Sequence, residues 1–174
     1  GQSLAGRDIG PLPEVVNPDR KAACERNFQL FCESYFPETY SLAWSPDHLK
    51  VIEKIETAVL RGGLFALALP RGSGKTTITE SAALWSMLYG HREFVVLIGA
   101  TESAALELLD SLKTELEVNE RLAEDFPEVC YPVAQLEGIA NRCAGQLYKG
   151  ERTRITWTSN EIVLPTVEGS RASG

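Results

Sequence analysis

The sequence has no long apolar run and no segment that would carry it across a membrane. In its 174 residues, no apolar stretch approaches the roughly 20 residues that a membrane-spanning helix needs. The first residues carry no basic stretch followed by an apolar one, which is the pattern of a secretory signal. We therefore expect a protein that is neither membrane-embedded nor secreted. Its 44% hydrophobic and 24% charged residues are typical of a soluble globular domain.

Cysteine and histidine are scarce, with four Cys and two His in the chain. No Cys-x-x-Cys pair occurs and no pair of histidines lies near the cysteines, so the spacing of a zinc site is missing. We expect buried free thiols, which are typical of a cytosolic protein, rather than disulfides. The four are Cys24, Cys32, Cys130 and Cys143.

Positive charge is also in deficit, because 17 Lys and Arg stand against 24 Asp and Glu and give a net charge of −7. Non-specific DNA binding depends on Lys and Arg that neutralise phosphates. No basic stripe with interleaved aromatic residues is present. This balance argues against strong non-specific DNA binding by this stretch alone, and it identifies no DNA-contacting residue.

The most informative stretch is LFALALPRGSGKTT, residues 64–77. Its apolar run, 64–69, predicts a short buried strand, and a helical pattern begins at Lys75. Two glycines between them, Gly72 and Gly74, let the backbone approach an anion where a Cβ would obstruct it. A strand, a glycine loop with Gly-Lys-Thr and a helix together predict a phosphate-binding loop.

The residue types in this loop suit nucleotide phosphates and magnesium. Backbone N–H groups and the helix dipole favour an anion. Lys75 would place its ammonium on the β- and γ-phosphates, and the Thr76 hydroxyl would ligate Mg²⁺. Leu69 stands where the strict pattern has its first glycine, and the alternative of an ordinary strand-to-helix turn leaves this grouping unexplained. The residues expected to bind nucleotide are Pro70, Arg71, Gly72, Ser73, Gly74, Lys75, Thr76 and Thr77.

Strand and helix patterns alternate around this loop, which is typical of a parallel sheet covered by helices. The expected elements are an N-terminal arm or linker over 1–17, a helix from Asn17-Pro18 to Phe36, a helix from Ser45 to Gly62, a second buried strand over 94–98, a helix from Thr101 and a β-hairpin around 158–160. The fold class predicted from this order is α/β.

Three segments together resemble the large terminase subunit of tailed bacteriophages: WSPDH before LALPRGSGKTT, then FVVLIGAT, then ITWTSNEIVLPTVEGSRASG. The resemblance covers residues 40–174 and the N-terminal part of that family's ATPase domain. It implies a RecA-like P-loop NTPase that uses ATP and Mg²⁺ to drive double-stranded DNA into the procapsid. It also implies the host bacterial cytoplasm as location. The implied partners are a portal ring, a small terminase subunit and further copies of the chain.

The resemblance also suggests roles for single residues. The family often carries an arginine in the phosphate loop, so Arg71 would act with Lys75 on charge that develops in the transition state. It has an adenine-side motif ending in His-Gln; here the glutamine after His48 is missing, and Trp44 and His48 would flank the base. The alternatives are a solvated loop arginine and a core histidine. Arg171 would contact nucleotide or a neighbouring subunit, or be a solvated loop residue.

The acidic strand that hydrolysis requires is missing from the sequence. No apolar run after residue 99 ends in Asp-Glu or Asp-Asp, a pair that would hold Mg²⁺ and activate water. The nuclease carboxylates are absent too. We therefore expect 18–174 to be the N-terminal part of a longer ATPase domain that alone binds nucleotide weakly and barely hydrolyses it. The other interpretations are a helicase-like DNA-dependent ATPase, a phosphate-loop kinase and a non-catalytic interaction module.

Overall fold

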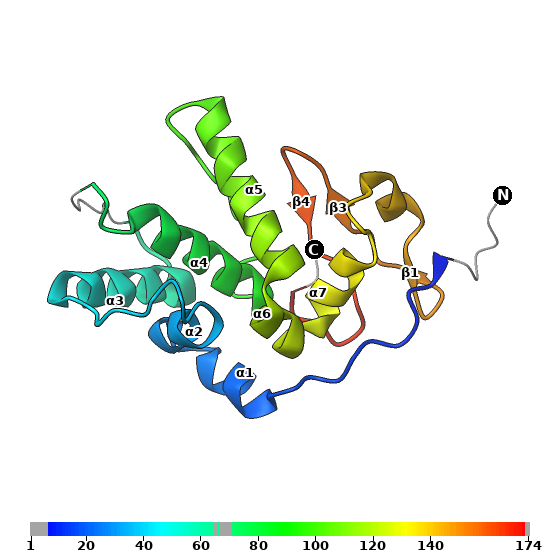
Figure 1. Cartoon of the computed structure of the whole chain (residues 1–174), viewed down its shortest axis with the longest axis horizontal. Coiled ribbons are helices and arrows are strands. Elements are labelled where there is room, and N and C mark those ends of the chain that lie inside the picture. Colours follow the sequence, from blue (N-terminus) through cyan, green and yellow to red (C-terminus); the bar gives the residue numbers. More distant parts are fainter. Residues whose placement is uncertain (1–6, 65, 67–70, 173–174) are drawn as a thin grey trace.

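The computed structural model describes residues 7–64, 66 and 71–172, and over them the chain is mostly helical (Figure 1). The helices are α1 (Pro18–Cys24), α2 (Phe28–Tyr35), α3 (Pro46–Arg61), α4 (Lys75–Leu88), α5 (Glu102–Val118), α6 (Glu120–Asp125), α7 (Pro127–Ala134) and the 3₁₀ helix η2 (Ala140–Gly145). The strands are β1 (Leu147–Tyr148), β2 (Glu151–Arg152), β3 (Thr156–Trp157) and β4 (Ile162–Val163).

The predicted parallel sheet is wrong for this chain. Within the described residues the strands form two separate antiparallel pairs, β1 with β2 and β3 with β4, and no parallel sheet. The hairpin predicted around 158–160 is present as the β3–β4 pair, but each of its strands has two residues. The helical layers therefore do not cover a central sheet, and the α/β fold class is replaced by a mainly helical one.

The two expected buried strands have different outcomes: one is not described by the structure, and the other is wrong. The first, 64–69, lies largely outside the described residues, and Leu64 at its start is fully exposed. The second, 94–98, forms no strand. A continuous apolar run predicts burial on both faces, but here only Val95 and Leu97 pack against the core. The other three side chains point outward, with Phe94 83%, Val96 61% and Ile98 84% exposed.

Helix starts were the most predictable feature. Ser45 caps α3, with Pro46 as its first helical residue, and Thr101 caps α5 by accepting a hydrogen bond from the Ala104 N–H. The single helix expected between Asn17 and Phe36 is instead two helices. Asn27 interrupts it, because its side chain accepts a hydrogen bond from the Leu30 N–H and starts α2.

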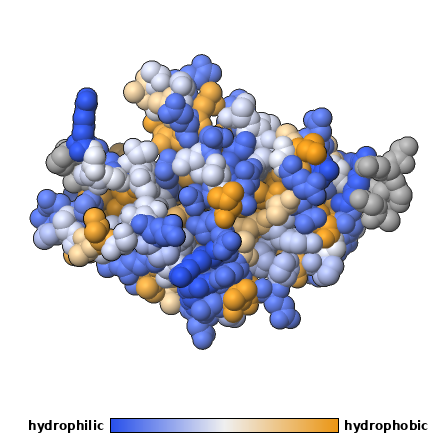
Figure 2. Space-filling model, in the orientation of Figure 1, coloured by the Kyte–Doolittle hydropathy of each residue, from blue (hydrophilic) through white to orange (hydrophobic). Residues whose placement is uncertain are grey.

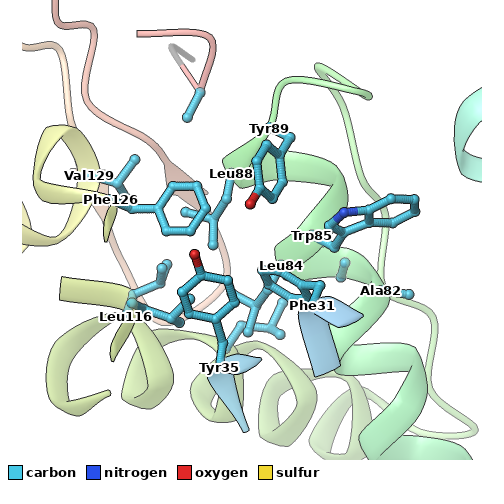
Figure 3. Close-up of a cluster of buried hydrophobic side chains, with 14 of the residues drawn as sticks. Phe31, Tyr35, Ala82, Leu84, Trp85, Leu88, Tyr89, Leu116, Phe126 and Val129 are labelled. Carbon is cyan, nitrogen blue, oxygen red and sulfur yellow. The ribbon is translucent and has the colours of Figure 1, made fainter. Parts of the chain in front are cut away.

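The hydrophobic core is built around α4, which packs against α2, α3 and α5. Figure 3 shows side chains of α4 facing Phe31 and Tyr35 of α2, with Phe126 closing the cluster from the other side. Trp85 is completely buried and donates from Nε1 to the Cys24 carbonyl at 3.0 Å. The core therefore fixes α4, and with it the loop that precedes α4.

Helix α5 buries only its C-terminal half. Leu112 and Leu116 are buried, whereas the start of α5 and the extended segment before it project from the body as an arm (Figure 1). Figure 2 shows apolar atoms on this projection among hydrophilic ones. Only the second half of α5 therefore contributes fully buried side chains to the core.

Gly90 follows the end of α4 and lies against the backbone of the C-terminal segment at Arg171. It has φ +66°, and a Cβ there would lie 2.2 Å from the Arg171 carbonyl oxygen. We expect Gly90→Ala to lower the free energy of unfolding, measured by urea denaturation, by about 2–3 kcal/mol. The control is Gly138→Ala, where φ is +71° and no atom lies within 4 Å, for which we expect about 1 kcal/mol. Equal losses would mean that the Arg171 backbone moves aside freely.

The N-terminal segment from residue 7 to 17 crosses the molecule rather than hanging free. The Ile9 N–H donates to the Leu147 carbonyl and the Val16 N–H to the Glu124 carbonyl, each at 2.9 Å.

All four cysteines are free thiols, and burial raises the pKa of Cys130 to about 12. In the part of the chain that the structure describes, every helix is too short or too polar to cross a bilayer.

Candidate functional site

The predicted phosphate loop leads directly into α4. Residues 71–74 form a turn, and the helix begins at Lys75 as the sequence predicts. Gly72 and Gly74 both have φ +77°, a left-handed conformation that glycine adopts without strain. A Cβ added at either glycine would meet no atom of the described residues within 4 Å. Among those residues, the backbone is therefore open at the positions where a ligand would have to approach it.

The start of α4 has the electrostatics of an anion site. The first N–H groups of an α-helix have no partner within the helix, and the helix dipole adds partial positive charge there. Gly74 is the residue that caps α4, and it contributes no side-chain hydrogen bond. Two cationic residues flank this end, the exposed Arg71 and the half-buried Lys75. The arrangement suits a polyanion such as a nucleotide triphosphate.

Thr76 is exposed in the first turn of α4, where the sequence predicts a magnesium ligand. In the described ranges, no group of three or more His, Cys, Asp or Glu is placed to hold a metal ion. A single hydroxyl holds magnesium only together with phosphate oxygens and water, as is usual for Mg²⁺ at nucleotide sites. The residues therefore fit Mg²⁺ that arrives with a nucleotide rather than a metal site of the protein itself.

His48 lies against the loop rather than in the core. Its Nε2 is 2.9 Å from the Ser73 carbonyl oxygen, and its Nδ1 is 2.8 Å from the Ser45 Oγ. A carbonyl oxygen only accepts hydrogen bonds, so Nε2 carries the proton and donates. The N-terminal ends of α3 and α4 thus meet on the same side of the molecule (Figure 1).

An aromatic column runs from the core to this histidine. Its members are spaced four residues apart, with ring centroids separated by 6.5, 4.9 and 6.2 Å: Phe36, Tyr40, Trp44 and His48. The Tyr40 hydroxyl is 2.8 Å from the Ser81 Oγ of α4, and the Trp44 Nε1 donates to Glu33 at 2.7 Å. Burial raises the pKa of Tyr40, so its hydroxyl keeps its proton. This column, residues 36–48, is called the aromatic strap below.

The carboxylate nearest to Thr76 along α4 is Glu80, four residues further on. Burial raises the pKa of Glu80, a hydrogen bond with Ser111 of α5 opposes that rise, and the charge of Glu115 adds to it. The side chain therefore interacts with α5. Its partners lie on α5, and it stands one helical turn beyond the exposed Thr76 on α4.

Apart from Arg171, the predicted site residues that the structure describes lie around the start of α4. Ser73 and Thr77 are half-buried in the loop and first turn, between the more exposed positions, and Pro70 lies outside the described residues. Arg171 is elsewhere: it forms an ion pair with Glu25 and lies beside Gly90, after the end of α4. Since α4 has 14 residues at about 1.5 Å each, Arg171 lies about 20 Å from the loop.

Sequence reasoning missed the residues that hold the loop in place. Ser45 was predicted only as the start of a helix, and Tyr40 was not singled out. The available signal was the spacing of four between the aromatic residues of the strap, which places successive rings on one side of a chain that is helical or turning.

A comparison with protein-family models, with curated proteins and with solved structures found no match for this chain.

Proposed function

We propose that residues 71–77 bind the phosphates of ATP together with Mg²⁺, and that the chain is the ATP-binding segment of a viral DNA-packaging motor of the terminase kind. The observation that carries the proposal is the pair of left-handed glycines that open directly onto a helix starting with Lys75 and Thr76. Because the described residues form no parallel sheet, the proposal rests on this loop and on the quoted sequence segments, and not on the fold.

Each loop residue has a definite part in this proposal. Lys75 contacts the β- and γ-phosphates, Thr76 shares Mg²⁺ with them, and the exposed Arg71 would face the γ-phosphate. Hydrolysis, DNA translocation and contacts with a portal ring or small subunit belong to the complete motor. Binding of nucleotide is the part of the function that this chain can be tested for directly.

The test is calorimetric titration of the protein with a non-hydrolysable ATP analogue and Mg²⁺. We expect measurable binding that Lys75→Ala weakens about 10- to 100-fold, because a charge-assisted contact with phosphate is lost. The matched control is Lys54→Ala, which removes an exposed lysine in the second half of α3 and should leave affinity unchanged. Absence of binding by the wild-type protein, or equal binding by Lys75→Ala, would refute the proposal.

A further inference from the structure

The peptide unit between Ser73 and Gly74 is held by a hydrogen bond from another part of the molecule. Its carbonyl accepts the hydrogen bond from His48 Nε2 at 2.9 Å. A trans peptide is planar, and its C=O and N–H point in opposite directions. The contact therefore also fixes the direction of the Gly74 N–H, which points away from α3.

This peptide unit needs an external restraint because glycines stand on both sides of Ser73. Glycine populates left-handed and right-handed conformations about equally, so rotation of the Ser73–Gly74 peptide meets little local resistance. If this peptide rotated freely, a ligand that requires one orientation of it would bind more weakly, because ordering the loop costs free energy. A hydrogen bond made before the ligand arrives removes part of that cost.

His48 is itself held from several sides. Ser45 Oγ donates to Nδ1 and accepts the His48 backbone N–H at 3.2 Å, so both the ring tautomer and the start of α3 are fixed. The Trp44 ring lies edge-on to the imidazole. Further along the aromatic strap, Tyr40 is bonded to Ser81, whose hydroxyl donates to the Thr77 carbonyl at 3.0 Å. The strap thus contacts both the loop before α4, through His48, and the second turn of α4, through Tyr40.

We propose that His48 is a positioning residue, which orients the Ser73–Gly74 peptide for phosphate binding and does not contact the base. The inference rests on the proposed function, since it assigns His48 a task within that site. It separates two roles for this side chain. A residue beside the base affects only ligands that contain a base, whereas a residue that orients the loop affects every ligand that carries phosphates.

The test compares two ligands and two variants by calorimetry, with Mg²⁺–ATP analogue and Mg²⁺–pyrophosphate as probes. His48→Phe keeps a ring against Trp44 but has no donor; His48→Gln places an amide N–H at the same number of bonds from the backbone as Nε2. We expect His48→Phe to weaken both probes equally, by about three- to tenfold. We expect His48→Gln to restore both to within about twofold. Circular dichroism should show unchanged helix content.

The outcomes are distinct. Weakening of the ATP analogue alone would place His48 at the base and overturn the positioning role, as would unchanged binding of both probes by His48→Phe. If the wild-type protein binds neither probe, the proposed function fails, and ¹⁵N relaxation of the ligand-free protein decides the positioning role by itself. In that measurement the Gly74 amide should be more mobile in His48→Phe and restored in His48→Gln. Equal mobility in all three proteins would overturn the inference.

Discussion

Replacement of Asp125 by alanine is expected to lower the free energy of unfolding by about 3–5 kcal/mol. The carboxylate is completely buried. It accepts hydrogen bonds from Arg20 Nε and the Tyr35 hydroxyl, each at 2.6 Å, and from the Asn17 N–H at 3.1 Å. Its removal leaves a buried hydroxyl and a mostly buried guanidinium without their partner, which is the costly way to break such a network. Urea denaturation measures the loss.

The control for this prediction is Glu124→Ala. Glu124 pairs with the same Arg20, at 2.7 Å, but its side chain is 42% exposed. An ion pair that water reaches contributes at most about 1 kcal/mol. If the two variants lost equal stability, the buried network would carry no more than the exposed pair, and the prediction would be wrong.

The same carboxylate predicts a pH dependence. Burial by itself would raise the pKa of Asp125, but hydrogen bonds from Arg20, Tyr35 and the Asn17 backbone outweigh it and hold this pKa below its usual range. Because the folded-state pKa lies below the unfolded value of about 3.9, the stabilisation is fully present above that value. It is lost as the pH falls through the folded-state pKa. Stability of Asp125→Asn should therefore decline less steeply below about pH 4.

Trp85→Ala is the second substitution for which we expect a loss of about 3–5 kcal/mol. The side chain is fully buried, with the Phe28 ring at 5.2 Å and the His91 ring at 4.9 Å between centroids. Truncation opens a cavity in the middle of the core and leaves the Cys24 carbonyl without the indole donor. The expected result is a lower urea midpoint with an unchanged slope.

A matched control is Leu42→Ala, which truncates an apolar side chain that is 85% exposed. It should change stability by less than about 0.5 kcal/mol. A loss below about 1 kcal/mol for Trp85→Ala would mean that the core closes around the missing indole, contrary to its close ring contacts with Phe28 and His91.

The sequence predicted helices well because their signals are local. Ser45-Pro46 and Thr101 start helices through hydrogen bonds within a single turn, and the periodic apolar residues that follow predict the body of each helix. Residues 127–134 form α7 despite a proline inside it at position 132. Here burial of Val129 and Cys130 against the core outweighs the lost hydrogen bond.

The strand predicted over 94–98 was wrong because a strand requires a partner, which its own sequence does not specify. The run 94–98 has the composition of a buried strand, yet only alternate side chains find the core. The candidate site shows the same division. Gly72, Gly74 and Lys75 were recognisable from local spacing, whereas the contact between His48 and Ser73 joins residues 25 positions apart and follows from how α3 packs beside α4.

The extended segment before α5 has a consequence for the protein in concentrated solution. It offers Phe94, Val96 and Ile98 to the solvent in a row, and an apolar backbone edge of this kind is a template for pairing between molecules. At neutral pH the net charge of −7 keeps the molecules apart, but this repulsion vanishes near the isoelectric point of about 4.9. Precipitation on acidification would therefore begin at this edge while the core remains folded.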